Sequence, residues 1–157
     1  MIVTPHPGAA GRFTIETHGP EGPMASRHNW AQSLVPGNAV WPAANRALYV
    51  PVRVPFPCTV LKLGWSHGAS SGNGDIGLYE TGWTRLTSTG SQAPSGSNVD
   101  QWYDVTDVTI ARGIYYLSMS TDTGATATWW SFSPAATLCQ ALGILQQASA
   151  FPLPATA

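Results

Sequence analysis

Hydrophobic and polar residues alternate in short runs from about residue 46 to residue 135, and turn residues separate the runs. Alternation with a period of two is typical of β-strands that bury one face. Gly72-Asn73-Gly74-Asp75 is one of the separators, and Asn and Gly tolerate the positive φ angles of tight hairpins. The pattern predicts strands over residues 48–54, 59–65, 76–80, 83–87, 99–105, 114–120 and 126–132.

The run 59–65 illustrates how alternation assigns side chains to faces, because successive side chains of a strand point to opposite sides. A regular strand would place Leu61, Leu63 and Trp65 on one face, and Cys58, Val60 and Lys62 on the other.

The strand predicted over residues 114–120 is hydrophobic on both faces. Tyr116 and Leu117 are adjacent, so they point in opposite directions. We therefore expect this strand to be covered by the opposite sheet on one side and by an arm or a neighbouring subunit on the other. The residues expected in buried packing are Leu61, Leu63, Ile76, Leu78, Ile114, Tyr116, Leu117 and Met119.

The two ends of the chain differ from this middle part. Nine of the 13 prolines fall within residues 1–57, which disfavours regular strand pairing there. Residues 1–45 are predicted to form an extended arm with Trp30 and Trp41 as hydrophobic anchors. Residues 136–157 form a second segment, anchored by Phe151 and Leu153, and the spacing of leucines within it suits a short helical turn or a strand equally well. Either end could pack on its own domain or on a neighbouring subunit.

The fold class that follows is all-β, an antiparallel β-sandwich of jelly-roll type over residues 46–135. Composition agrees, because only 10% of the residues are charged, against about 25% in typical domains. The formal net charge is −1 and no basic cluster is present, which argues against nucleic-acid and anionic-membrane partners. Neither a stretch of about 18 apolar residues nor a signal peptide is recognisable. We expect a protein made in the cytoplasm.

Catalytic and metal-binding chemistry is weakly represented. Common catalytic and nucleotide-binding motifs are missing, so no catalytic residue, metal or cofactor is predicted. A triad could be drawn from Ser66, His67, Ser70 and Asp75, but an exposed hairpin tip explains the same residues. A calcium site could be drawn from Asp100, Asp104 and Asp107, although Asp more commonly caps turns. Cys58 and Cys139 are expected to be two buried thiols rather than a disulfide.

The seven tryptophans are the most informative residue class. Trp129 and Trp130 are adjacent in a predicted strand, so one of them must point away from the core. Trp83 would share a strand face with Arg85 and Thr87, and Trp102 would share one with Asp104 and Thr106. Such faces suit sugar stacking or a protein interface, or the rings could lie under loops of the same subunit. The candidate interface or glycan contacts are Trp83, Arg85, Trp102, Asp104, Trp129 and Trp130.

Several runs resemble small jelly-roll modules of tailed-bacteriophage virion proteins. The runs lie at residues 45–55 (Asn-Arg-Ala-Leu-Tyr-Val-Pro-Val-Arg-Val-Pro), 64–65, 75–79 (Asp-Ile-Gly-Leu-Tyr), 104–107, 113–120 (Gly-Ile-Tyr-Tyr-Leu-Ser-Met-Ser) and 149–154. The resemblance implies a non-enzymatic role in capsid decoration, in a tail fibre or tail tip, or in binding host-surface glycans, commonly as a trimer.

Two hypotheses follow. The first is a structural protein of a bacteriophage virion, which would act by subunit assembly and surface display, with itself and other virion proteins as partners. The low charge, the apolar proline-rich ends and the surplus of aromatic residues favour it. The second is a carbohydrate-binding module that attaches to host-surface glycans through its tryptophans. An enzyme is not expected.

Overall fold

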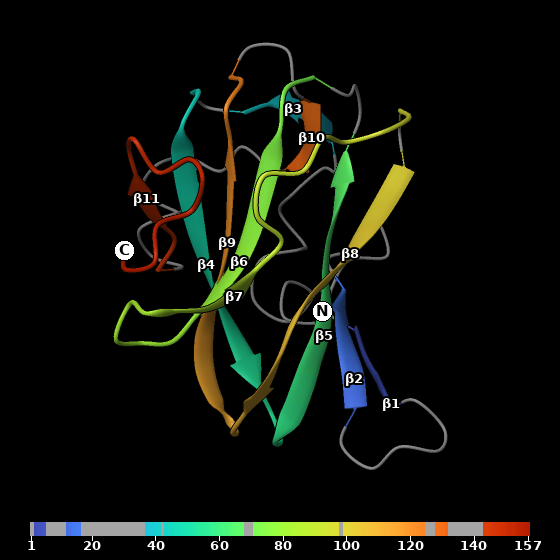
Figure 1. The fold of residues 1–157 in the computed structure, drawn as a ribbon, viewed down its shortest axis with the longest axis vertical. Coiled ribbons are helices and arrows are strands. Elements are labelled where there is room, and N and C mark those ends of the chain that lie inside the picture. The colour runs from blue at the N-terminus through green and yellow to red at the C-terminus, as the bar shows by residue number, and fades with distance from the viewer. Residues whose placement is uncertain are drawn as a thin grey trace.

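The computed structural model describes residues 2–5, 12–16, 37–41, 43–67, 71–97, 99–124, 128–131 and 143–157, and in these residues the protein consists of strands and turns without a helix (Figure 1). The first sheet contains β1 (Ile2–Pro5), β2 (Arg12–Glu16), β3 (Gly37–Val40), β5 (Cys58–His67), β8 (Val99–Ile110) and β10 (Thr128–Ser131). The second sheet contains β4 (Arg46–Val54), β6 (Gly74–Tyr79), β7 (Arg85–Ser88), β9 (Gly113–Thr121) and β11 (Leu145–Gln147). The predicted all-β class with antiparallel sheets is confirmed; among the described strands, β2 and β5 form the one parallel pair.

The order of the strands in the sheets brings distant parts of the chain together. The second sheet has the order β11-β4-β9-β6-β7, and β4 pairs with β9 along their whole lengths. In the first sheet, β5 pairs with β8. Two of the crossings between the sheets, at residues 55–57 (β4 to β5) and at residues 111–112 (β8 to β9), lie at the bottom of Figure 1. The pair β5–β8 is therefore nested in sequence inside the pair β4–β9.

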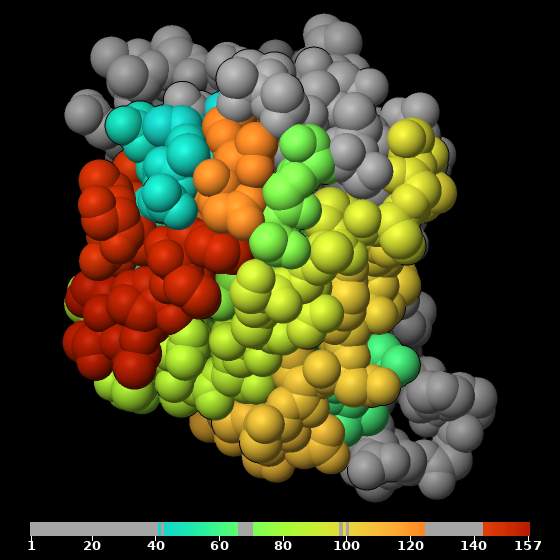
Figure 2. Space-filling model, turned by 45° about the horizontal axis from the view of Figure 1, so that its top comes forward, coloured from blue at the N-terminus to red at the C-terminus, as the bar shows by residue number. Residues whose placement is uncertain are grey.

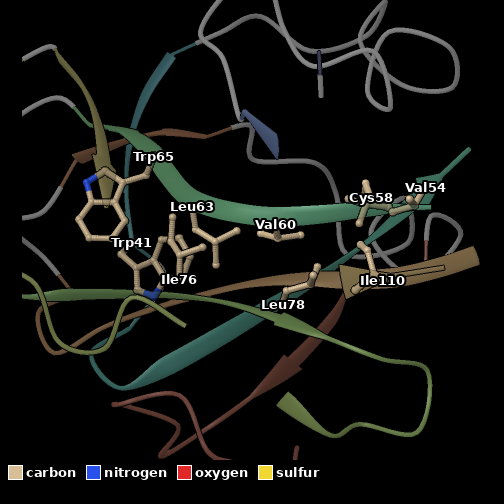
Figure 3. Packing of buried hydrophobic residues seen from close by; sticks show 10 residues of the cluster. Trp41, Val54, Cys58, Val60, Leu63, Trp65, Ile76, Leu78 and Ile110 are labelled. Atoms are coloured by element: carbon tan, nitrogen blue, oxygen red, sulfur yellow. The ribbon is translucent and has the colours of Figure 1, made fainter. Parts of the chain in front are cut away.

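The main hydrophobic core lies between the two sheets (Figure 3). The inward residues of β4, β6 and β9 meet those of β5 and β8 there. Trp41, which was predicted as an arm anchor, belongs to this core, and its Nε1 donates a hydrogen bond to the Arg46 carbonyl oxygen at 2.8 Å. The buried members are Trp41, Val52, Val54, Cys58, Val60, Leu63, Trp65, Ile76, Leu78 and Ile110.

The predicted facing of β5 is wrong in its first half. Cys58 and Val60 are buried in the same core as Leu63 and Trp65. The pairing with β8 shifts register between Val60 and Lys62, and such a bulge reverses the side on which the following residues fall. Leu61 lies at this irregularity, so the predicted facing applies only to the residues that follow it in β5.

The predicted burial of Ile114 is also wrong, because 56% of its surface is exposed. Tyr115, Leu117 and Met119 pack against the main core, which leaves Ile114 and Tyr116 on the outer face of β9. Tyr116 is covered there by Trp83. Ile114 pairs with the exposed Arg53 near the end of the sheet, so β9 is covered on both faces only over its later residues.

Within the described residues, no helix is long and apolar enough to cross a membrane. The predicted arm, residues 1–45, includes β1, β2 and β3, whose strand pairings are described, whereas Trp30 lies outside the described residues. Of the C-terminal region left open as a helical turn or a strand, residues 145–147 are the strand β11, and residues 132–142 lie outside the description.

Candidate functional site

Residues 145–157, called here the C-terminal segment, run across the outer face of the second sheet. At one edge of that sheet, β11 pairs with β4. At the opposite edge, the Arg85 amide donates to the Ala155 carbonyl oxygen at 2.9 Å, and the Ala157 amide donates to the Trp83 carbonyl oxygen at 3.0 Å. The segment is part of the continuous red patch at one side of the molecule in Figure 2. It therefore occupies both edges of the sheet and the face between them.

Leu153 is the side chain that anchors this segment. It is only 2% exposed and lies directly over β6, where a Cβ added to Gly77 would stand 3.0 Å from Leu153 Cδ1. A glycine inside a strand often marks the close approach of another group, so Gly77 was a usable sequence signal for this contact. Ala150 and Leu153 belong to a second buried cluster, with Ala47, Tyr49 and Tyr79. The Ala150 amide donates to the Asn45 carbonyl oxygen at 2.7 Å.

A buried carboxylate lies beneath the segment. Asp75 is fully buried, its Oδ2 accepts the Leu153 amide at 3.0 Å, and its Oδ1 accepts the Thr89 hydroxyl at 3.2 Å. Burial raises the pKa of Asp75, while these two hydrogen bonds and the nearby positive charge of Arg85 act in the opposite direction. Asp75 thus serves the segment, and the exposed hairpin tip predicted for it is wrong, because Asp75 is buried in β6. The side chains of Ser66 and His67, and all of Ser70, lie outside the described part of the structure.

Four aromatic rings form the floor beside Leu153. Trp83 stacks on Tyr116, with ring centroids 4.5 Å apart and an interplanar angle of 28°. Tyr49 meets Trp83 edge-on at 5.8 Å and Tyr79 at 5.2 Å. Tyr79 donates from its hydroxyl to the Pro154 carbonyl oxygen at 2.6 Å, and burial raises its pKa. Trp83 therefore takes part in a packed cluster within the chain.

Arg85 closes this site from the β7 edge. Its guanidinium donates to the Leu153 carbonyl oxygen in addition to the backbone bond with Ala155. The structure thus joins Trp83, Arg85 and Leu153, which the sequence assigned to two separate groups of candidates. Phe151, the other predicted anchor of this end, is half-buried.

Trp102 and Asp104 lie on a different surface, the outer face of the first sheet. Trp102 is paired with Gly64 across β5 and β8, and a Cβ added to Gly64 would stand 2.4 Å from Trp102 Cε3. The ring therefore packs directly over the glycine. Lys62 Nζ lies 3.0 Å from Asp104 Oδ1; the Asp104 side chain is largely exposed and that of Lys62 about half exposed. This surface combines a half-buried indole with a neighbouring ion pair.

The remaining candidates are placed only in part. Trp129 and Trp130 lie in β10, which pairs with β3, and Trp129 is opposite His67 of β5. Their side chains, like all of Trp30, lie outside the described part of the structure. In the part of the chain that the structure describes, no three His, Cys, Asp or Glu side chains gather as metal ligands.

Comparisons of this chain with protein-family models, with curated proteins and with solved structures found no match. Two surfaces therefore bear on the possible functions. One holds the C-terminal segment, and the other is built around Trp102.

Proposed function

We propose that the protein is a non-enzymatic structural component of a tailed-bacteriophage virion, which acts by subunit assembly and surface display. The observation that carries the proposal is the nested pairing of β4 with β9 and of β5 with β8. Nested antiparallel pairs divided between two sheets are the arrangement expected of a jelly roll, and jelly rolls include viral capsid domains. The proposal therefore includes a β-sandwich of jelly-roll type.

The position of the resembling runs supports the same proposal. Residues 45–55 and 113–120 largely coincide with β4 and β9, which pair with each other, and residues 75–79 fall in β6 on the other side of β9. Residues 149–154 lie across this same sheet. Runs that are far apart in the sequence thus form one structural unit, as expected if their resemblance reflects a shared module.

The proposed partners are further copies of the chain, with a trimer favoured by the resemblance, and other virion proteins. Sparse charge lowers the desolvation cost of burying surface between subunits. The exposed apolar side chains of the described residues add to this: Phe56, Val99, Ile114 and Leu145.

The experiment is to raise antibodies against the recombinant full chain and to label purified particles of the phage or prophage that encodes it. Regular gold labelling in electron micrographs, together with the chain in the mass-spectrometric inventory of the particles, is the expected result. Presence of the chain in the infected-cell lysate and its absence from purified particles would overturn the proposal.

The second candidate function is binding of host-surface glycans, which the Trp102 surface favours. Sugar rings stack on aromatic faces while neighbouring polar groups bind their hydroxyls. Trp102 packs over Gly64, with the exposed side chains of Lys62 and Asp104 nearby on the same two strands. Trp83 is a poorer candidate because Tyr116 and Tyr49 already contact its ring.

A glycan array tests this second function with a matched pair of tryptophan variants. If the chain binds a glycan through this surface, Trp102→Ala abolishes the signal and Trp83→Ala retains it, provided that both variants are shown to be folded by circular dichroism. A negative array for the unmodified chain, or equal loss in both variants, would contradict the assignment.

A further inference from the structure

The C-terminal segment makes the contacts of an added ligand, because its main chain completes both edges of a sheet that is already formed. The strands β4, β9, β6 and β7 pair successively with one another, and none of these pairings involves the segment. The segment contributes β11 at one edge and an isolated bridge between Thr84 and Thr156 at the other. Addition of an extended peptide to open sheet edges is a recurring mode of recognition.

The receptor groove is built by residues 45–120, which include the fully buried Ser118 and Ser120 on the outer face of β9. Gly77 and the rings of Tyr79 and Trp83 shape the place of Leu153 and its neighbours. Asp75 supplies the acceptor for the Leu153 amide, and Arg85 supplies the donor for the Leu153 carbonyl oxygen. Every group that recognises the segment therefore belongs to the body of the sheet and would be present whichever chain supplied the segment.

The segment itself offers few buried apolar side chains. In residues 145–157, Ala150 and Leu153 are buried, whereas Leu145, Pro152 and Ala155 are exposed. Most of its attachment consists of hydrogen bonds, which contribute modestly because water competes for the same groups. Regions with few buried contacts open at a lower free energy than the core does. Release of the segment would leave two open sheet edges that need a new strand.

We propose that this groove binds the C-terminal segment of a second copy of the chain, so that subunits are linked by exchange of residues 145–157. The inference rests on the proposed assembly role, for which it names the contact between subunits. Exchange of an identical element uses the contacts that already exist within one chain and needs no new interface. The groove selects an extended segment with a leucine that fits over Gly77 and a main chain that meets Asp75 and Arg85.

The position of Thr84 opposite Thr156 allows a direct test in the full chain. The two residues form a bridge flanked by the backbone hydrogen bonds Arg85–Ala155 and Ala157–Trp83, so they are a non-hydrogen-bonded pair. The Cα atoms of such a pair lie about 4.5 Å apart, which is within the range that a disulfide spans. Both side chains are exposed, so substitution to cysteine should not disturb folding. A tagged Thr84→Cys chain and an untagged Thr156→Cys chain, each also carrying Cys139→Ser, are mixed in urea, refolded together and oxidised.

We expect a covalent heterodimer on a non-reducing gel. A control mixture of Thr84→Cys with Thr109→Cys, whose exposed threonine lies on the first sheet, should give at least tenfold less heterodimer. In the double variant Thr84→Cys/Thr156→Cys, a disulfide confined to single chains, with no heterodimer in the mixed sample, would overturn the exchange. No disulfide in either sample would overturn the groove contact itself. Gold labelling of purified particles does not depend on either disulfide result. A virion protein whose subunits do not exchange the segment can therefore be told apart from a protein that is absent from the virion.

Discussion

Replacing Gly64 with alanine should destabilise the protein strongly, although the change adds a single methyl group. Gly64 is buried in β5, and its added Cβ would stand 2.4 Å from Trp102 Cε3 and 2.5 Å from the Gln101 carbonyl oxygen. The indole could rotate away, but the carbonyl oxygen belongs to the paired strand β8 and can move only with that strand. Overpacking of this kind costs typically 1–3 kcal/mol, and we expect a value near the upper limit, about 3 kcal/mol.

Urea denaturation followed by tryptophan fluorescence measures this loss. Gly82→Ala is the matched control, because its nearest neighbour would be Glu80 Oε1 at 3.6 Å and its φ angle is not positive. The control should change the free energy of unfolding by less than about 0.5 kcal/mol. If Trp102 contributes to the clash, Gly64→Ala should cost about 1 kcal/mol less in a Trp102→Ala background than in the unmodified chain. A cost for Gly64→Ala equal to that of Gly82→Ala would refute the placement of the indole over the glycine.

Three further predictions concern buried groups. Burial raises the pKa of Asp75 in the folded state, so the folded chain holds that proton to higher pH than the unfolded chain does. The free energy of unfolding therefore falls as pH rises from the ordinary carboxyl pKa through the raised one. Asp75→Asn should flatten this decline in urea titrations carried out at increasing pH from the ordinary carboxyl pKa upward. An unchanged slope would contradict the assignment. Burial raises the pKa of Cys58 to about 12, so in a Cys139→Ser chain it should react with a thiol reagent only after unfolding; immediate reaction of the folded chain would count against its burial. Leu78→Ala should cost about 2–5 kcal/mol and Ile114→Ala less than about 0.5 kcal/mol, because Leu78 is fully buried and Ile114 is exposed; similar costs by thermal denaturation would contradict these positions.

The strands were predictable because their signal is local. Alternation located β4, β6 and β9 to within a few residues, and Gly72 and Asn73 marked the turn before β6. The inward face of β5 was not predictable, because the register shift after Val60 depends on how β8 pairs with it. The exposure of Ile114 likewise depends on which part of the outer face Trp83 and the C-terminal segment cover.

The candidate site was predictable only in its parts. Trp83, Arg85 and Leu153 were each singled out, but their meeting depends on contacts between residues about 70 positions apart, which no local pattern encodes. Asp75 was predicted in an exposed turn, although it is buried and accepts the Leu153 amide. Gly64 and Gly77 were the best missed signals, since a glycine within a strand indicates a close neighbour.

The nested pairing also sets the order in which the chain can fold during its synthesis. β4 lies between β9 and β11, so both of its hydrogen-bonded neighbours are translated long after it. A nascent chain that ends before residue 113 holds β4 and β6 without their shared partner β9. Such distant pairing is slow because loop closure precedes the stabilising contacts, and unpaired strands are prone to aggregation while they wait. Folding of the second sheet therefore waits until β9 has emerged from the ribosome, and its yield in the cell depends on how well the early strands are protected until then.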